Sequence, residues 1–308
     1  MKNKNLISVA LALLAMAFWG SLFPVIKLGY KYFKVNTSSA ADILIFAAIR
    51  FLLCGLIVCA FCLVKKEKYK IPDKREIASI ALMGFFAVTL HYGFTYIGLS
   101  LTDSSKTAIL KQLGTLLYVC FAFLFIKEEK FGINKLIGAI VGFLGIISIN
   151  SFGGKISFSI GDILIIAASF CTVISSVMSK KSVQTVCAIW VTGISQLFGG
   201  IVLMAVGISM GGKFPQFNIS AVLLLLYICI ASIAGYTLYY YVQKTMDLSS
   251  LFIVKFAEPL FAVLFGFLLL NEDIFKIEYI ASFILISAGI IIGNKVIKKK
   301  EKVILGKC

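Results

Sequence analysis

A lysine and a glutamate stand inside an apolar stretch of the sequence that is long enough to cross a lipid bilayer. Lys255 and Glu258 are three residues apart within residues 246–270, and Pro259 follows them directly. Residues with this spacing share one face of a helix, and a proline removes a backbone donor and loosens the turn. A charge near the middle of a membrane helix costs about 2.5–3.5 kcal/mol, so both side chains must face protein or water.

Two interpretations of this pair are open. An ion pair between Lys255 and Glu258 would do no more than hold helices together. Alternatively, the two groups belong to a site that recognises a zwitterion or a carboxylate and couples to a proton at Glu258. Either interpretation keeps the two side chains away from lipid.

Four more polar residues fall inside apolar segments. Lys111 has no acidic residue three positions on, so its counter-charge is either an anionic substrate group or a partner on a neighbouring helix, and Gln112 beside it joins the candidate substrate-binding residues. His91, the only histidine, is either a packed or tyrosine-bonded group or a proton relay. Arg50 is expected to be structural and to bond the backbone carbonyls of a neighbouring helix.

Aromatic residues recur at helical spacing in two segments. Tyr92 and Tyr96 lie four residues apart, as do Tyr236 and Tyr240. Packing is the default role for such rings, but equivalent pairs in two segments could line a cavity and stack on a planar ligand. Trp19 offers further stacking surface. No nucleophile–base arrangement, metal cluster, phosphate loop or nucleotide motif accompanies them, so neither an enzyme nor a cofactor nor ATP-driven transport is expected.

Composition defines the class of protein. Of 308 residues 60% are hydrophobic and 14% charged, and the mean hydropathy is +1.00, which is typical of a polytopic membrane protein. The formal charge of +16 has a topological cause, so no nucleic-acid partner is expected. The expected partners are a small-molecule substrate and membrane lipid, and a homodimer is left open. Seven of the eight cysteines lie within or beside apolar segments, where cysteine behaves as a small hydrophobe.

About 20 apolar residues are enough to cross a bilayer, and the sequence contains ten such stretches. They are residues 6–28, 42–64, 77–99, 105–126, 135–152, 160–179, 186–208, 219–243, 249–270 and 277–296. Among the lysines and arginines of the termini, the loops and the ends of these stretches, 20 fall on one side of the membrane and six on the other, and the remaining four lie deeper within the stretches. The positive-inside rule therefore predicts that both termini are cytoplasmic.

The chain contains an internal duplication. Residues 92–147 superimposed on residues 236–291 with a constant offset of 144 give 18 identities in 56 positions, including Lys111 with Lys255 and Tyr92 with Tyr236. Each repeat holds five spans, an odd number, so the second copy enters the membrane inverted. The predicted fold is an all-α membrane protein of ten transmembrane helices, with a first repeat over 1–152, a second over 153–297 and a basic cytoplasmic tail over 298–308. Inverted repeats recur in secondary transporters, whose binding site lies near the midplane.

Several motifs in the sequence match those of a known family. They are Trp19-Gly20-Ser21 with Lys27, Arg50-Phe51-Leu52-Leu53, residues 111–117 (KQLGTLL) followed by Lys127-Glu128-Glu129, and Glu258-Pro259-Leu260-Phe261 followed by Asn271-Glu272. The chain resembles the EamA-like branch of the drug/metabolite transporter superfamily over nearly its whole length, as two tandem repeats. One departure is that Gly114-Thr115 stands where Glu258-Pro259 stands in the second repeat, which places symmetric flexing of the two helices in doubt.

The resemblance implies a ten-helix secondary carrier of the cell membrane with a central cavity between its halves. Members of the family commonly export amino acids, other metabolites or drugs. The expected function is therefore export of a small metabolite, an amino acid or a related amphipathic or aromatic compound, by alternating access and with Glu258 or His91 as the proton-coupling group. Import, carriage of nucleotide sugars or drugs, and a membrane-embedded sensor or enzyme are the alternatives.

Overall fold

The computed structural model describes residues 2–65, 67–99, 101, 104–125, 129–149, 159–270 and 277–294. Every regular element within these ranges is a helix. In chain order the helices are α1 (Lys2–Tyr32), α2 (Ala40–Val64), α3 (Lys74–Gly84), the π-helix η1 (Phe85–Leu90), α4 (His91–Leu99), α5 (Ser104–Phe125), α6 (Ile133–Ile149), α7 (Ile160–Thr185), α8 (Ala188–Ser209), α9 (Ile219–Val242), α10 (Leu248–Lys255), α11 (Glu258–Leu270) and α12 (Ile277–Gly293).

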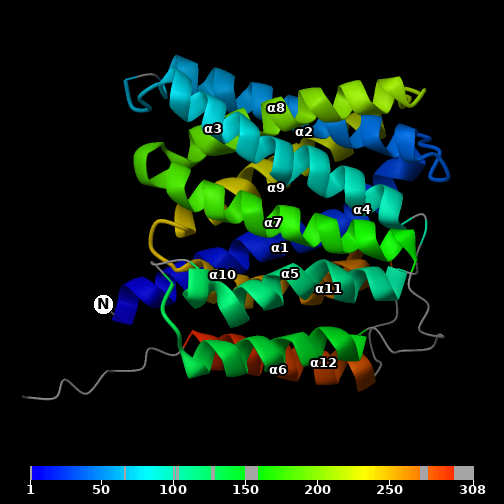
Figure 1. Cartoon of the computed structure of the whole chain (residues 1–308). Helices are drawn as coiled ribbons and strands as arrows, with labels where there is room; N and C mark the ends of the chain where they lie inside the picture. Colours follow the sequence, from blue (N-terminus) through cyan, green and yellow to red (C-terminus); the bar gives the residue numbers. More distant parts are fainter. Residues whose placement is uncertain are drawn as a thin grey trace, which may run out of the picture.

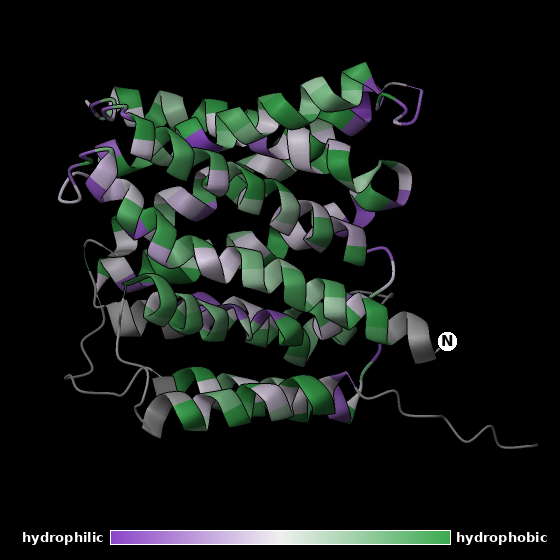
Figure 2. Cartoon of the chain, turned by 180° about the vertical axis from the view of Figure 1, so that it is seen from behind, coloured by the Kyte–Doolittle hydropathy of each residue, from purple (hydrophilic) through white to green (hydrophobic). Residues whose placement is uncertain are grey.

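The helices lie side by side, and their connections gather at the two ends of the bundle (Figure 1). Seven helical stretches in the described part of the chain are long and apolar enough to cross a membrane, and three shorter apolar helices lie within α5, α6 and α12. Apolar residues dominate the helices, whereas hydrophilic residues collect in the loops (Figure 2). Outward-facing side chains are often large and apolar, such as Ile219 with 82% and Val64 with 79% exposure. Such a surface suits lipid as solvent.

The predicted duplication is visible in the helix bounds. Shifting α6 by 144 positions gives the bounds of α12, and shifting α5 the same way gives the start of α10 and the end of α11 to within one residue. Within the first repeat, α3, η1 and α4 together correspond to α9. The first helix of the first repeat, α1, starts at the left-hand end of the bundle, whereas the first helix of the second repeat, α7, starts at the opposite end (Figure 1). The two copies therefore run in opposite senses.

Packing follows the same symmetry. The helices α2 and α8 are equivalents that pack against each other, as do α6 and α12. In the second pair glycines allow backbone contact, because a Cβ on Gly289 would lie 2.6 Å from the Gly138 carbonyl oxygen. In α8 a Cβ on Gly200 would lie 2.9 Å from the backbone nitrogen of Leu52 in α2. The small glycine residues therefore let these helices approach each other closely.

Two helices break the symmetry. The π-helix Phe85–Leu90 interrupts the third apolar stretch, whereas its equivalent in α9 is continuous. Conversely, a turn at Phe256 and Ala257 separates α10 from α11, whereas α5 runs unbroken past the equivalent positions. The predicted loosening before Pro259 is thus a two-residue turn between two helices. Symmetric flexing of these two helices stays in doubt, because the first repeat has neither the proline nor the turn.

Candidate functional site

Seven aromatic side chains form one group in the middle of the bundle, and we call them the aromatic cluster. Its members are Trp19 from α1, Phe51 from α2, Tyr92 and Tyr96 from α4, and Tyr236, Tyr239 and Tyr240 from α9. Phe51 links the two repeats, because its ring centroid lies 4.9 Å from that of Tyr92 and 6.4 Å from that of Tyr236. Trp19 continues the series 5.0 Å beyond Tyr236. Edge-on and tilted contacts at these separations are favourable.

The structure therefore brings together all five aromatic residues that the sequence singled out. Phe51 was noted only as part of a motif, yet it is the ring that joins the others. Helical spacing identified the two tyrosine pairs, but it carries no information about which neighbouring helix completes a cluster. That neighbour is α2, which packs between α8, α9 and α4.

Both repeat-equivalent lysines face the same side of α1. The Nζ atom of Lys255 lies 5.9 Å from the ring centroid of Trp19, and that of Lys111 lies 5.8 Å from the ring centroid of Phe23. Trp19 and Phe23 are four residues apart, so their side chains neighbour each other on one helix face. Cations within about 6 Å of a ring face are attracted by its quadrupole. Two positive charges thus converge beside the aromatic cluster, one from each repeat.

Lys255 and Glu258 do not form the ion pair that one interpretation expected. Within the described residues the ion pairs both involve Lys135, and none joins these two side chains. The turn at Phe256 and Ala257 separates Lys255, the last residue of α10, from Glu258, the first of α11. The two charges still interact at longer range, although no direct contact joins them.

Glu258 occupies the N-terminus of a helix at the contact between α11 and α1. A carboxylate is stabilised there by the helix dipole. The contact is close, because a Cβ on Gly20 would lie 3.0 Å from the Glu258 carbonyl oxygen and would clash with the Phe261 side chain. Glu258 therefore sits on α11 next to the helix turn that carries Trp19.

Trp19 is locked in place by a glycine on α9. A Cβ on Gly235 would lie 2.6 Å from the indole Nε1, so any larger residue would displace the ring. The Nε1 atom is enclosed and has no hydrogen-bond partner among the residues that the structure describes. A buried donor without a partner costs about 1–3 kcal/mol. The interior thus holds a donor that a polar ligand atom could satisfy.

His91 and Gln112 are the two remaining polar candidates, and both are buried. The Nδ1 atom of His91 lies 3.1 Å from the carbonyl oxygen of Ala168 and 3.0 Å from the hydroxyl of Thr172, both on α7. Its ring packs edge-on against Tyr92 at 5.0 Å. His91 is therefore packed and bonded to α7 rather than to a tyrosine hydroxyl. Gln112 is 6% exposed on α5 and makes none of the described ring contacts.

Arg50 does not bond carbonyls in the manner that the sequence led us to expect. Its guanidinium carbon lies 4.2 Å from the ring centroid of Phe51 and 5.3 Å from that of Tyr92. The residue is 2% exposed, and Nε and Nη2 have no hydrogen-bond partner within the described ranges. Aromatic rings, and not backbone oxygens, are thus its neighbours.

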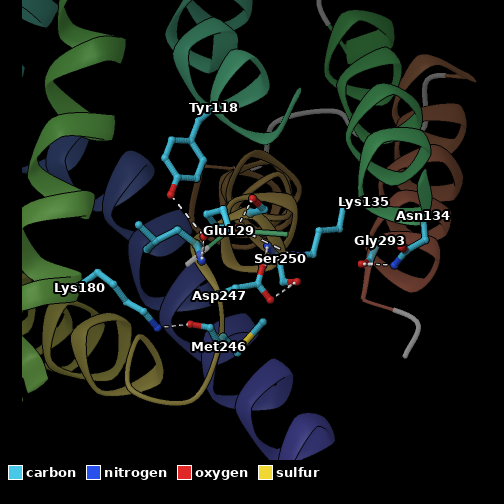
Figure 3. A network of polar contacts seen from close by, with 11 residues as sticks. Tyr118, Glu129, Asn134, Lys135, Lys180, Met246, Asp247, Ser250 and Gly293 are labelled. Carbon is cyan, nitrogen blue, oxygen red and sulfur yellow. Dashed lines mark hydrogen bonds and ion pairs between the residues drawn. The ribbon is translucent and has the colours of Figure 1, made fainter. Parts of the chain in front are cut away.

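A second polar assembly lies at the end of the bundle where α1 begins (Figure 3). It consists of Tyr118, Glu129, Lys135, Asp247, Ser249 and Ser250, and we call it the end network. The buried Glu129 carboxylate accepts hydrogen bonds from the Tyr118 hydroxyl (3.3 Å), the Leu248 amide (2.9 Å) and the Ser249 hydroxyl (2.7 Å). Glu129 belongs to the first repeat and the α10 start to the second. The network therefore ties the two repeats together.

Asp247 completes the end network. It caps α10 by accepting from the Ser250 amide at 2.9 Å, and Lys135 donates to it at 2.7 Å. Burial disfavours its charged form, but Lys135 and the Ser250 bonds outweigh this and hold the pKa of the Asp247 carboxyl below its usual value. Nearby, the Lys180 ammonium group donates to the carbonyl oxygen of Met246 at 2.6 Å. The loop before α10 is thus held by charged groups from three other segments.

Sequence reasoning did not identify the end network. Glu129 was noted only in a family motif, and Lys135 only among the counted basic residues. Asp247, which the offset of 144 pairs with Asp103, was the available signal, because an aspartate directly before a helical stretch is a preferred N-cap. Asp103 lies outside the described residues, so the corresponding contact at the other end of the bundle is not observed.

The fold and these two assemblies define a polytopic membrane protein whose inverted halves share one interior. The chain belongs to the EamA-like transporter family, whose sequence pattern matches residues 6–151 and again residues 159–294. The predicted family resemblance is confirmed, and so is the two-repeat architecture.

Similar proteins carry transporter names. An uncharacterized transporter from Archaeoglobus fulgidus is 28% identical over 84% of this chain and 88% of its own length. The uncharacterized inner membrane transporter YedA from Escherichia coli is 27% identical over 95% of this chain and 92% of its own. A solved crystal structure with a TM-score of 0.74 and 18% identity covers 92% of this chain and 95% of that chain, which supports the fold.

Proposed function

We propose that this membrane transporter exports a small metabolite from the cytoplasm, an amino acid or a related amphipathic or aromatic compound. The observation that carries the proposal is the aromatic cluster with Lys111 and Lys255 beside it, because both repeats contribute to it. Flat rings suit a planar apolar side chain, and convergent polar groups orient its charged end. A highly charged nucleotide sugar would fit such a lining less well.

The proposed transport mechanism is alternating access between the inverted repeats. We place ten spans in the membrane, the seven long stretches and the three shorter helices, and assign residues 1–152 to the first repeat and 153–297 to the second. Both termini, including the tail over 298–308 outside the described residues, are cytoplasmic in this proposal because basic residues collect on that side. The Escherichia coli relative is named an inner membrane protein, which supports a location in the cell membrane.

The end network is the proposed cytoplasmic gate. It lies where α1 begins, and it joins the loop before α6 to the start of α10 across the repeat boundary. Opening the cytoplasmic side requires these contacts to separate. Glu258 is the proposed proton carrier, since it heads α11 beside the helix interruption, where a change in charge can alter the backbone geometry.

Export is tested in cells that overproduce the protein. We expect them to tolerate a toxic aromatic amino-acid analogue and to contain less of it, and we expect Lys255→Ala to abolish both effects although the protein still reaches the membrane. Accumulation of the analogue would contradict export and favour an importer. Failure of any amino acid or analogue to compete for binding to purified protein would instead favour a drug or nucleotide-sugar carrier, a sensor or an enzyme.

The proposed topology is tested separately. In a cysteine-free variant, single cysteines at positions 70 and 213 should differ in labelling by an impermeant reagent added to whole cells. Position 213 should react and position 70 should not. The reverse pattern would invert the proposed topology and would place the end network outside.

A further inference from the structure

Arg50 is the most deeply buried charge in the aromatic region, and the proposed mechanism does not use it. Only 2% of its surface is exposed, and Nε and Nη2 have no hydrogen-bond partner within the described ranges. No described carboxylate pairs with it, because the described ion pairs all involve Lys135. Two of the three guanidinium nitrogens are therefore buried without a described partner, among aromatic rings that bear hydroxyl groups.

The ring contacts of Arg50 offset only part of the free-energy cost of burying its charge. Phe51 and Tyr92 lie within cation–π distance of the guanidinium, at 4.2 and 5.3 Å, and such contacts stabilise a desolvated cation. Removing an ion from water remains unfavourable even after the protein relaxes around it. The difference means that an anion placed beside the guanidinium would be bound strongly. Arginine suits a carboxylate in particular, because its planar donors bind both oxygens at once.

Arg50 also lies at a definite place relative to the other charges. Phe51, on which its guanidinium rests, contacts Tyr236, and Tyr236 contacts Trp19, beneath the Lys255 ammonium group. Arg50 and Lys255 therefore stand at opposite ends of one continuous set of rings. A compound that stacks on the rings can present its anionic end to Arg50 and leave the rest of its length against Trp19.

We infer that Arg50 binds the carboxylate of the transported compound and so selects for substrates that carry one. This assignment rests on the proposed function and specifies its substrate class: aromatic or amphipathic acids, amino acids included. The rings of Phe51 and Tyr92 cover the guanidinium, so they must shift as the carboxylate arrives. Lys255 at the other end then contacts the body of the substrate rather than its carboxylate.

The test compares two pairs of ligands that differ at the carboxyl group. L-Phenylalanine is compared with L-phenylalaninamide, and phenylacetate with phenylacetamide. Thermal stabilisation of the purified full-length protein in lipid nanodiscs gives the affinity of each ligand, since a ligand that binds the folded state raises the melting temperature. The proteins compared are the wild type, Arg50→Gln, Arg50→Lys and the exposed control Arg75→Gln.

The wild type should prefer the carboxylate member of each pair by about tenfold or more, as expected for loss of a charged hydrogen-bond pair. Arg50→Gln should remove the preference, Arg50→Lys should keep part of it, and Arg75→Gln should leave it intact. A preference that persists in folded Arg50→Gln overturns the assignment. An equal loss of binding of the carboxylate and the amide member of a pair in folded Arg50→Lys also overturns the assignment, since it would show that Arg50 has a purely structural role.

The outcome separates this inference from the proposed function. If phenylacetate binds in an Arg50-dependent manner but L-phenylalanine does not, the amino-acid proposal fails and the carboxylate assignment stands. If L-phenylalanine binds without dependence on Arg50, the amino-acid proposal stands and the carboxylate assignment fails. If no member of either pair stabilises the wild-type protein, both are overturned.

Discussion

Glu129 provides the sharpest test of the gate, because its buried carboxylate holds three donors at once. One oxygen accepts from the Tyr118 hydroxyl and the Leu248 amide, and the other accepts from the Ser249 hydroxyl. In Glu129→Gln the amide oxygen can serve the first two donors, and the amide nitrogen can donate to the Ser249 oxygen. That variant loses the charge but keeps the geometry. Glu129→Ala loses both.

The expected effects differ in size. Hydrogen bonds to a charged group contribute about 1.5–3 kcal/mol and neutral ones about 0.5–1.5 kcal/mol, so Glu129→Gln should destabilise the closed end by about 1 kcal/mol. Glu129→Ala also leaves the amide of Leu248, a residue that is 2% exposed, without a partner. We therefore expect a loss of about 3 kcal/mol in that variant. At 1.4 kcal/mol per factor of ten, the population of the open state rises about fivefold in Glu129→Gln and about 100-fold in Glu129→Ala.

The assay measures how often this end opens. Leu248→Cys in a cysteine-free variant places a thiol at a buried position and keeps the backbone amide that Glu129 binds. Its rate of reaction with an impermeant thiol reagent, in vesicles that expose the cytoplasmic face, reports the open population. The exposed neighbour Lys130 provides the control variant Lys130→Met, whose rate should equal that of the parent. Equal rates in Glu129→Ala and the parent would refute the gate.

Three further predictions concern other parts of the chain. Glu258→Gln should leave the protein folded but remove the acceleration of transport by a pH gradient, measured in proteoliposomes, and unchanged gradient dependence would move the role elsewhere. Gly289→Ala should lower the melting temperature, because its Cβ would lie 2.6 Å from the Gly138 carbonyl oxygen, whereas Ile284→Ala on the exposed face should change it little. Since the pKa of Asp247 is lowered, its bond to Lys135 should persist at all pH values above the usual carboxyl range and fail only below about pH 4. Gate opening that rises between pH 8 and pH 5, after correction for thiol ionisation, would contradict this last expectation.

Sequence reasoning anticipated the features that depend on local pattern. Apolar length revealed the helices, and the constant offset of 144 revealed the duplication, because both are properties of the linear chain. The break before Pro259 followed from the missing backbone donor alone.

The remainder depends on contacts between distant segments. The guanidinium of Arg50 contacts the ring of Phe51 on α2 and the ring of Tyr92 on α4, instead of the backbone carbonyls that we expected. No pattern in the sequence indicates these two contacts. The ion pair of Lys255 with Glu258 was one expected outcome of helical spacing, but the structure places a turn between the two residues and no ion pair joins them. Glu129 stands 119 positions before the amide that it binds, so its role is visible only once the repeats are packed. The roles of Lys111, Gln112, His91 and Glu258 in transport stay predictions.

Counterflow in proteoliposomes is the most direct test of the central claim that the aromatic cluster and its lysines carry an aromatic amino acid. Vesicles that contain the purified protein are loaded with unlabelled L-phenylalanine and diluted into a trace of labelled compound. The wild type should accumulate label transiently, and so should the control Lys130→Met, whereas Trp19→Leu and Lys255→Met should match empty vesicles although both remain monodisperse. Counterflow that is absent from folded wild-type protein with every aromatic amino acid, or that is equal in all four proteins, would contradict the account.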